Sequence, residues 1–259
     1  MISIKSDQEI QIMHEGGKIL ASILANLIKA VKSGITTQDL NKLAQELVFK
    51  FGAKSSFLNY NGYPSVLCTS VNDEIVHGVP SDRKLQKGDL LKLDMGVLYK
   101  GFHTDSAVTV LVGSGLTLNK VPLFDKGTLL KKKLIRVTKE ALGVGIKQAR
   151  PGNTIGDIGS AIQKYVEKNG FNVVRDLVGH GIGRELHEEP QVPNYGKAGE
   201  GEKLKPGMVI AIEPMVVMGD WKIKEGPDGF VFSTKDGGLA CHFEHTVAIT
   251  SHGPVILTL

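Results

Sequence analysis

The sequence predicts an α+β fold built from two similar halves related by pseudo-twofold symmetry. The first observation is an internal repeat: the segment 28–34 matches 146–152, at an offset of 152 − 34 = 118. The second is a later match at 213 − 94 = 119, which pairs Leu85, Gly88 and Asp94 with Leu204, Gly207 and Glu213. An offset constant within one residue over a helix, a stop and a strand indicates a duplicated unit. Each half is expected to supply two helices and a hairpin of strands.

The first half is predicted to begin with two helices. Ser6 followed by Glu9 is a capping-box pattern, and apolar residues then recur at mostly helical spacing. Thr36 or Thr37 is expected to cap the second helix, whose apolar stripe begins at Leu40. Glycines interrupt or end these helices: Gly16 and Gly17 lie inside the first, and Gly34 and Gly52 end the two.

Strands are predicted to follow the two helices. A loop-rich stretch leads into them, and the expected strands cover 66–71, 89–94 and 103–112. Gly96 and Gly101 bracket the turn that we expect between the last two strands. The segment 113–126 is predicted to be a loop that joins the halves.

The second half is predicted to repeat this order. A long helix is expected from about Lys126 to Ala149, with the run 131–133 of lysines on its solvated face. Pro151-Gly152 stops it, and Thr154 caps a further helix that continues to about Lys168. Strands are expected at 208–213 and 243–249.

A glycine-rich stretch at 179–190 separates the helices of the second half from its strands. Gly179, Gly181 and Gly183 make a helix unfavourable there, because glycine is costly inside one. An extended or looped segment that brings His180 and His187 close to a ligand is one interpretation. A glycine-rich turn with two surface histidines is the other, and this segment alone does not decide between them.

Composition places the chain among ordinary globular proteins. Its 259 residues are 41% hydrophobic and 22% charged. No apolar run approaches a membrane span, and the N-terminus lacks the features of a signal peptide. Two cysteines imply no disulfide framework, so we expect a cytoplasmic protein. The net charge of +4 permits contact with an anionic partner without requiring one.

Four carboxylates occupy matching positions in the two halves. Asp94 and Glu213 end the first strand of each half, and Asp105 and Glu244 lie on the next strands. Each acid alone is most simply a surface residue at a strand end. Pseudo-twofold symmetry would instead gather all four, and buried unpaired charges are very costly. Two divalent ions would neutralise them and could hold a nucleophilic hydroxide, so the duplicated set favours a metal site.

The chain resembles the type I methionine aminopeptidases over essentially its whole length. The matching motifs are specific, and they are Asn72…His77-Gly78-Val79-Pro80, Leu93-Asp94-Met95-Gly96, Thr104-Asp105, Gly179-His180-Gly181-Ile182-Gly183, His187-Glu188-Glu189-Pro190, Pro193-Asn194-Tyr195-Gly196, Ile212-Glu213-Pro214 and Phe243-Glu244-His245-Thr246. The resemblance implies the duplicated pita-bread fold, a curved antiparallel sheet with helices on its outer face. It also implies a single catalytic domain over 1–259, with halves of about 1–125 and 126–259.

The resemblance assigns roles to the site residues. The implied metal ligands are Asp94, Asp105, His180, Glu213 and Glu244. Asp105 and Glu244 would bridge two divalent ions, which could be cobalt, manganese, iron or zinc. His77 and His187 would hydrogen-bond the scissile peptide without ligating metal, and Glu213 would also take a proton from the nucleophile. These two histidines and Glu213 are therefore the expected catalytic residues.

The resemblance also implies a methionine pocket. Its expected lining is Tyr60, Tyr63, Cys68, Leu186 and Phe230, beside His77 and His187. Leu186 and Phe230 depart from common family patterns, which have phenylalanine and, in some members, tryptophan there. His103 and His242 each lie two positions from a predicted ligand, and we expect them behind or beside the site rather than on a metal.

The expected function is removal of the initiator methionine from nascent proteins and peptides when the next residue is small. The expected protein is a monomer without DNA or membrane partners, and it could contact the ribosome transiently through the basic face around 131–133. A proline-directed peptidase of the same fold is the nearest alternative, although those relatives usually carry an extra N-terminal domain. A binding module that has lost its ligands is the other, and the filled ligand positions argue against it.

Overall fold

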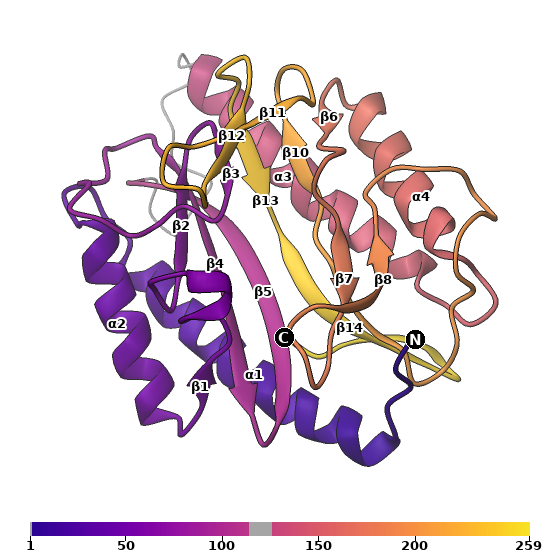
Figure 1. Ribbon diagram of the computed structural model, residues 1–259. Helices are drawn as coiled ribbons and strands as arrows, with labels where there is room; N and C mark the ends of the chain where they lie inside the picture. Colours follow the sequence, from indigo (N-terminus) through magenta and orange to yellow (C-terminus); the bar gives the residue numbers. More distant parts are fainter. Residues whose placement is uncertain (1, 114–125) are drawn as a thin grey trace.

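The computed structural model describes residues 2–113 and 126–259. Within these ranges, four α-helices lie on one side of a curved antiparallel sheet, and the opposite side is left open (Figure 1). The helices are α1 (Asp7–Ala30), α2 (Thr37–Lys50), α3 (Lys126–Gln148) and α4 (Ile155–Lys168), and a 3-10 turn covers Tyr60–Gly62. The predicted α+β class and the curved sheet with helices outside are confirmed.

The main sheet runs without a break from the first half into the second. Among the described residues it has nine strands, in the order β1-β4-β5-β14-β9-β7-β8, with β2 on β4 and β15 on β14. Its strands are β1 (Lys54–Ser55), β2 (Cys68–Val71), β4 (Leu90–Tyr99), β5 (Phe102–Leu111), β7 (Gly179–Gly181), β8 (Glu188–Val192), β9 (Val209–Ile212), β14 (Glu244–Thr250) and β15 (Gly253–Ile256). The halves meet where β5 pairs with β14.

Two small sheets flank the main one. One has the order β13-β10-β6, and the other has the order β11-β12-β3. Their strands are β3 (Glu74–Val76), β6 (Asn172–Val173), β10 (Met215–Val217), β11 (Ile223–Glu225), β12 (Phe232–Thr234) and β13 (Ala240–His242). Since β3 belongs to the first half and β12 to the second, the second small sheet is another place where the halves are joined.

The internal repeat is visible as paired geometry. The bridge between Thr36 and Lys84 recurs between Thr154 and Lys203, at offsets of 154 − 36 = 118 and 203 − 84 = 119. Each threonine also caps a helix through a capping box with the aspartate three residues later. Thr36, not Thr37, is the cap of α2, because its hydroxyl accepts from the backbone N–H of Asp39.

The core is divided between the halves. In the first half, α1 and α2 pack their apolar faces against β2 and β4. In the second, α3 and α4 cover the strands around β9, β10 and β14. Gly17 lies where α1 crosses the end of the chain, and a Cβ on it would collide with the Leu257 carbonyl oxygen. The glycine inside α1 therefore allows close packing and does not interrupt the helix.

Some predicted boundaries were wrong. Gly96 does not bracket a turn, because β4 continues to Tyr99 and the chain reverses at Lys100 and Gly101. A Cβ on Gly96 would lie 2.8 Å from the Ser56 Cβ, so this glycine admits a neighbouring loop. The first helix ends at Ala30 rather than at Gly34. Of the predicted loop 113–126, residues 114–125 lie outside the described residues, and Lys126 already begins α3.

No helix within residues 2–113 and 126–259 is both long enough and apolar enough to span a membrane.

Candidate active site

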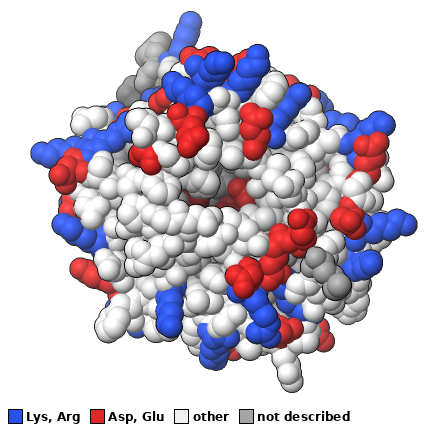
Figure 2. All heavy atoms as spheres, viewed as in Figure 1, with Lys and Arg blue, Asp and Glu red and all other residues white. Residues whose placement is uncertain are grey.

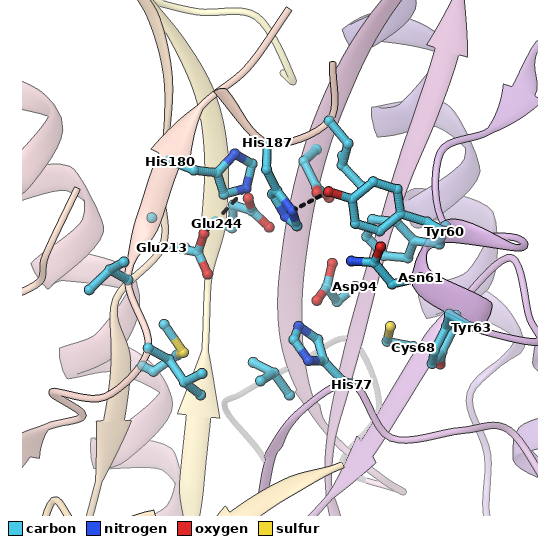
Figure 3. Close-up of a pocket in the computed structure, with 18 of the residues that line it drawn as sticks. Tyr60, Asn61, Tyr63, Cys68, His77, Asp94, His180, His187, Glu213 and Glu244 are labelled. Carbon is cyan, nitrogen blue, oxygen red and sulfur yellow. Dashed lines mark hydrogen bonds and ion pairs between the residues drawn. The ribbon is translucent and has the colours of Figure 1, made fainter. Parts of the chain in front are cut away.

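A cavity of about 630 Å³ opens on the side of the sheet that the helices leave free. Figure 2 shows this hollow near the centre of the molecule, with acidic atoms at its bottom. Both halves supply its walls. All the side chains predicted for the site line it: Tyr60, Tyr63, Cys68, His77, Asp94, Asp105, His180, Leu186, His187, Glu213, Phe230 and Glu244. The structure therefore brings together residues that are spread over most of the sequence (Figure 3).

Strand pairing gathers the four carboxylates. Asp94 and Asp105 lie on the paired strands β4 and β5, Glu244 begins β14, and Glu213 directly follows β9. Because β14 pairs with both β5 and β9, the acids of the two halves meet at the seam of the sheet. Ligand atoms of Asp105, His180 and Glu244 lie within 4.8 Å of one another, which suits a shared cation.

Burial makes the charged form of these acids unfavourable in the protein alone. It raises the pKa of Asp105 to about 7 and raises the pKa values of Asp94, Glu213 and Glu244 well above their ordinary range. Mutual repulsion adds to this effect, as each of these last three lies near other acids of the group. Asp94 Oδ1 has no hydrogen-bond partner in the described part of the chain. An oxygen-rich, buried and unneutralised group of this kind fits divalent cations.

Glycines on both sides of His180 bring its strand close to neighbouring backbone. A Cβ on Gly179 would collide with the Ala211 carbonyl oxygen, and one on Gly181 with the Glu189 carbonyl oxygen. His180 Nδ1 lies 2.9 Å from the Gly181 carbonyl oxygen, which can only accept, so Nδ1 carries the proton. Nε2 then offers a lone pair, and it lies 3.7 Å from Glu213 Oε1. Burial first, and His187 second, lower the His180 pKa to about 3, so the ring stays neutral.

His187 and His77 face the cavity from different segments. His187 Nδ1 lies 2.8 Å from the Tyr60 hydroxyl, and its ring centroid is 4.2 Å from that of His180. Burial lowers the His187 pKa, with a smaller effect from His103. His77 has a φ of 59°, which is uncommon outside glycine, and its ring approaches Phe232 edge-on. Burial first, and His187 second, lower the His77 pKa to about 4. His77 and His187 are therefore both neutral at physiological pH.

The remaining wall of the cavity is apolar and aromatic. Phe230 packs edge-on against Tyr63 at 5.5 Å between ring centroids. The Tyr63 hydroxyl shares its one proton between the carbonyl oxygens of Leu67 and Gly78, so its polar end has hydrogen-bond partners. Leu186 is buried, and burial raises the pKa of Cys68 so that it remains a thiol. This wall can receive an apolar side chain.

Sequence reasoning missed or left open some neighbours of the site. Asn61 also lines the cavity, and its φ of 47° in the 3-10 turn could not be read from its spacing. His242 is fully buried behind the floor, with Nε2 at 3.6 Å from Glu213 and Nδ1 at 3.9 Å from Asp94. His103 Nδ1 contacts the Ser56 hydroxyl at 2.8 Å.

Comparisons with known proteins agree with this geometry. The model of metallopeptidase family M24 matches residues 11–251. A methionine aminopeptidase from Clostridium perfringens is 47% identical over 259 residues, covering 100% of this chain and 99% of the relative. The crystal structure of a methionine aminopeptidase from Thermotoga maritima superposes with a TM-score of 0.92 at 44% identity, covering 100% of this chain and 99% of that one.

A proline-directed relative is more distant. Prolidase from Pyrococcus furiosus has a TM-score of 0.75 at 24% identity, and the match covers 99% of this chain but 65% of that one. This likeness shows a shared fold only. The chain therefore belongs to metallopeptidase family M24 and, within it, to the methionine aminopeptidases.

Proposed function

We propose that the protein removes the initiator methionine from the N-terminus of new proteins and peptides when the second residue is small. The observation that carries this proposal is the meeting of four carboxylates and His180 at the bottom of one open cavity, in a chain of the methionine aminopeptidase family. Neutral histidines and an apolar wall lie beside that group.

We infer that two divalent metal ions are held there. Asp105 and Glu244 come from the seam strands and would be shared, Asp94 would complete one site, and His180 with Glu213 would complete the other. Bound divalent ions supply acidified water as a nucleophile at neutral pH and stabilise negative charge. Cobalt, manganese, iron and zinc are all compatible with this mixture of carboxylate and imidazole ligands.

The other polar groups are suited to act on the substrate directly. Glu213 is the candidate proton acceptor, since its carboxylate lines the cavity beside the other acids and would be ionised once divalent ions neutralise the group. His77 and His187 are neutral, so they can donate hydrogen bonds to the scissile carbonyl and to the oxyanion that forms from it. In this proposal Glu213 transfers the proton, while His77 and His187 stabilise the negative charge.

The apolar wall supports the choice of methionine. Tyr63, Cys68 and Phe230 offer an uncharged surface near His77, and Tyr60 and Leu186 lie near His187. An apolar pocket separates side chains that differ by one methylene by only about 1–3 kcal/mol. Norleucine should consequently be accepted, whereas the size limit on the second residue is steric.

Peptide cleavage tests the proposed function. We expect the manganese-loaded protein to cleave Met-Ala peptides and norleucine-Ala peptides at comparable rates, and Met-Lys peptides at least 100-fold more slowly because the bulky second residue is excluded. An Ala-Ala peptide is the control for the pocket, and it should be a poor substrate. Equal rates on Met-Ala and Met-Lys would contradict the proposal, as would cleavage of X-Pro peptides in preference to both.

The setting of this activity is also inferred. We expect a cytoplasmic monomer whose 259 residues act as a single catalytic domain, with halves of about 1–125 and 126–259. A transient contact of the face around Lys131 and Lys133 with the ribosome stays a prediction. Lys131 Nζ donates to the Gly88 carbonyl oxygen and Lys133 Nζ to the Asn169 carbonyl oxygen, so these lysines already have partners within the protein.

A further inference from the structure

Lys92 is a charged side chain buried under the floor of the cavity, and none of the roles described above involves it. It lies on β4 two residues before Asp94, so both side chains leave the same face of the sheet. Only 1% of Lys92 is exposed. Within residues 2–113 and 126–259, no carboxylate lies within ion-pair distance of its ammonium group.

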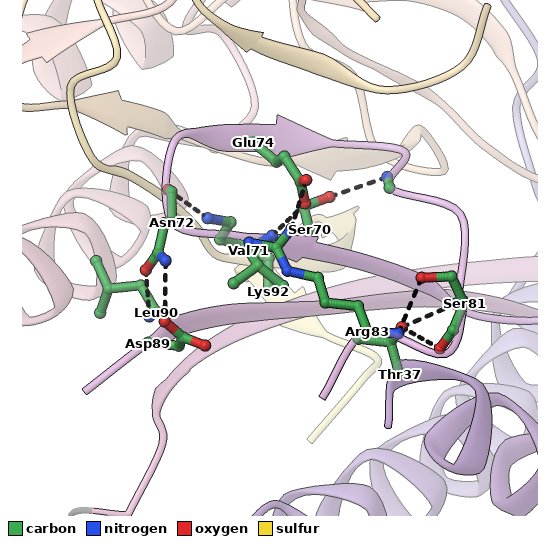
Figure 4. A network of polar contacts seen from close by, with 11 residues as sticks. Thr37, Ser70, Val71, Asn72, Glu74, Ser81, Arg83, Asp89, Leu90 and Lys92 are labelled. Carbon is green, nitrogen blue, oxygen red and sulfur yellow. Dashed lines mark hydrogen bonds and ion pairs between the residues drawn. The ribbon is translucent and has the colours of Figure 1, made fainter. Parts of the chain in front are cut away.

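Backbone carbonyl groups from both halves hold this ammonium group. Lys92 Nζ donates to the Asn72 carbonyl oxygen at 2.8 Å (Figure 4). It also donates to the Ala240 carbonyl oxygen at 3.2 Å. Asn72 lies in the turn between β2 and β3, and Ala240 begins β13. The Ala240 N–H donates to the same Asn72 carbonyl oxygen at 3.0 Å. Lys92 therefore joins a turn of the first half to a strand of the second.

The joined segments lead directly into the site. The turn at Asn72 is followed by β3, and His77 comes immediately after that strand. The strand that begins at Ala240 ends at His242, and Glu244 begins β14 two residues later. Lys92 itself precedes Asp94. A displacement of the Asn72 turn would thus be passed along three residues of β3 to His77.

The backbone is left-handed at both ends of the segment from the turn to the site. Both Asn72 and His77 have a φ of 59°, which is uncommon outside glycine, although asparagine and histidine adopt it more readily than most residues. The Asn72 side chain donates to Asp89 Oδ1 at 2.9 Å and accepts from the Leu90 N–H at 3.0 Å, which anchors one side of the turn to the start of β4. Its carbonyl oxygen points the other way, to Lys92 and Ala240. Lys92 supplies the side-chain contact on that second side.

Burying an ammonium group without an anionic partner is costly, and an apolar side chain of similar length would fill the same space. What lysine adds is N–H donors for two carbonyl groups at once. We propose that Lys92 is a positioning residue, which ties the Asn72 turn to β13 and thereby holds His77 where it meets the substrate. This inference rests on the catalytic role proposed for His77.

Hydrogen exchange tests the tether independently of activity. In Lys92→Met, which removes the N–H donors and is one heavy atom shorter than lysine, we expect the amides of residues 72–78 and 240–242 to exchange at least tenfold faster. The control is Ile162→Ala, which truncates a buried residue of α4 away from the cavity. Exchange in both segments should match wild type in that control. Unchanged exchange in Lys92→Met would overturn the proposal.

A double-mutant cycle with His77→Ala tests the catalytic consequence. At saturating manganese, Lys92→Met should lower kcat on a Met-Ala peptide by about 10–100-fold, because small misplacements of a transition-state contact are expensive. KM should change by less than about threefold. If Lys92 acts through His77, then adding Lys92→Met to His77→Ala should cost less than about threefold more. A loss in the double variant equal to the product of the single losses would overturn the proposal.

The controls separate this proposal from the proposed function. Ile162→Ala should be less stable than wild type but keep its kcat. If Ile162→Ala and Lys92→Met lose kcat equally, then Lys92 is merely structural. A wild-type protein that fails to cleave Met-Ala peptides would contradict the proposed function, while the exchange experiment would still decide the tether. If Lys92→Met does not fold, Lys92→Gln retains a donor for one carbonyl group. We then expect an intermediate loss of kcat, and wild-type kcat in Lys92→Gln would overturn the proposal.

Discussion

His180 and His187 are seven positions apart, but their surroundings give them different chemistry. His180 is fixed by its own strand, where the Gly181 carbonyl oxygen accepts a hydrogen bond from Nδ1–H and leaves Nε2 directed at the acids. His187 is fixed from the other half, because its Nδ1 contacts the Tyr60 hydroxyl. The first arrangement suits a metal ligand, and the second leaves Nε2 available for a substrate.

Alanine variants of the two histidines should separate these roles. His180→Ala should lose tight binding of one manganese ion. His187→Ala should keep both ions and bind peptide, but kcat should fall by roughly 10²–10³ because a donor to the transition state is gone. Calorimetric metal titration and steady-state kinetics on both variants provide the measurement. Loss of a metal in His187→Ala together with retention in His180→Ala would reverse the assignment.

At the scale of single residues, sequence patterns predicted the lining of the cavity far better than they predicted its support. The lining residues carry motifs that few other folds contain, so their gathering could be expected. Lys92 carries no such signal, since a lysine on a strand is ordinarily solvent-facing. Its burial depends on the contact with Ala240 of β13, a distant strand whose position cannot be predicted from the pattern of β4 alone.

Helical glycines show how much one element depends on its neighbour. Gly17 of α1 and Gly143 of α3 look equivalent in sequence, because both interrupt an otherwise regular helical pattern. Gly17 packs against the carbonyl group of Leu257, whereas nothing lies within 4 Å of a Cβ built on Gly143. The sequence could predict both helices, but it could not tell which glycine is required by packing.

Alanine at these two positions should therefore have opposite effects. Gly17→Ala should lower the free energy of unfolding by about 1–3 kcal/mol, because the new methyl group meets backbone that cannot move away easily. Gly143→Ala should raise it by about 0.5–1 kcal/mol, because alanine is the better helix former. Urea denaturation of both variants gives the comparison. Destabilisation by Gly143→Ala to the same extent would refute the packing explanation for Gly17.

At the scale of the whole molecule, the seam between the halves concentrates unfavourable charge. The buried acids have raised pKa values, so the metal-free folded state binds more protons than the unfolded state does. Their contribution to stability is fully present below the unfolded pKa of about 4 and is lost as pH rises through the folded values, about 7 for Asp105. Bound divalent ions would remove this loss by neutralising the ionised acids.

The melting temperature should record this coupling. We expect the difference in Tm between manganese-loaded and chelated protein to grow steadily from pH 5 to pH 8, because metal affinity rises as the ligands lose protons. At a free metal concentration of 100 times Kd, binding adds about 2.7 kcal/mol of stability. Scanning calorimetry at several pH values measures the difference, and Asp105→Asn should reduce it. A difference that is constant with pH would contradict the proposed neutralisation.

The architecture was predictable from the repeat, while the join between the halves was not. Matching offsets indicated two units, and the helix caps and most strands followed from local patterns. The pairing of β5 with β14 and that of β3 with β12 depend on contacts between distant segments. The spacing of apolar residues within one segment does not predict such contacts. The extent of β4 was missed for a related reason. Gly96 allows the neighbouring loop at Ser56 to pack closely against the strand, and it does not form a turn.

The contacts of the N-terminal segment have a consequence for the order in which the chain folds as it is made. Lys5 pairs with Glu188 across 183 positions and Arg184 with Glu9 across 175, and the Leu257 carbonyl group packs against Gly17. Lys5 and Glu9 therefore lack these two long-range partners until the chain has been made as far as Glu188. Such long sequence separations slow folding, because loop closure must precede the contacts that repay it. Residues 5–9, which brace the loop before His187, can therefore be held in place only after much of the second half has been made, although α1 can pack earlier against α2 and β4.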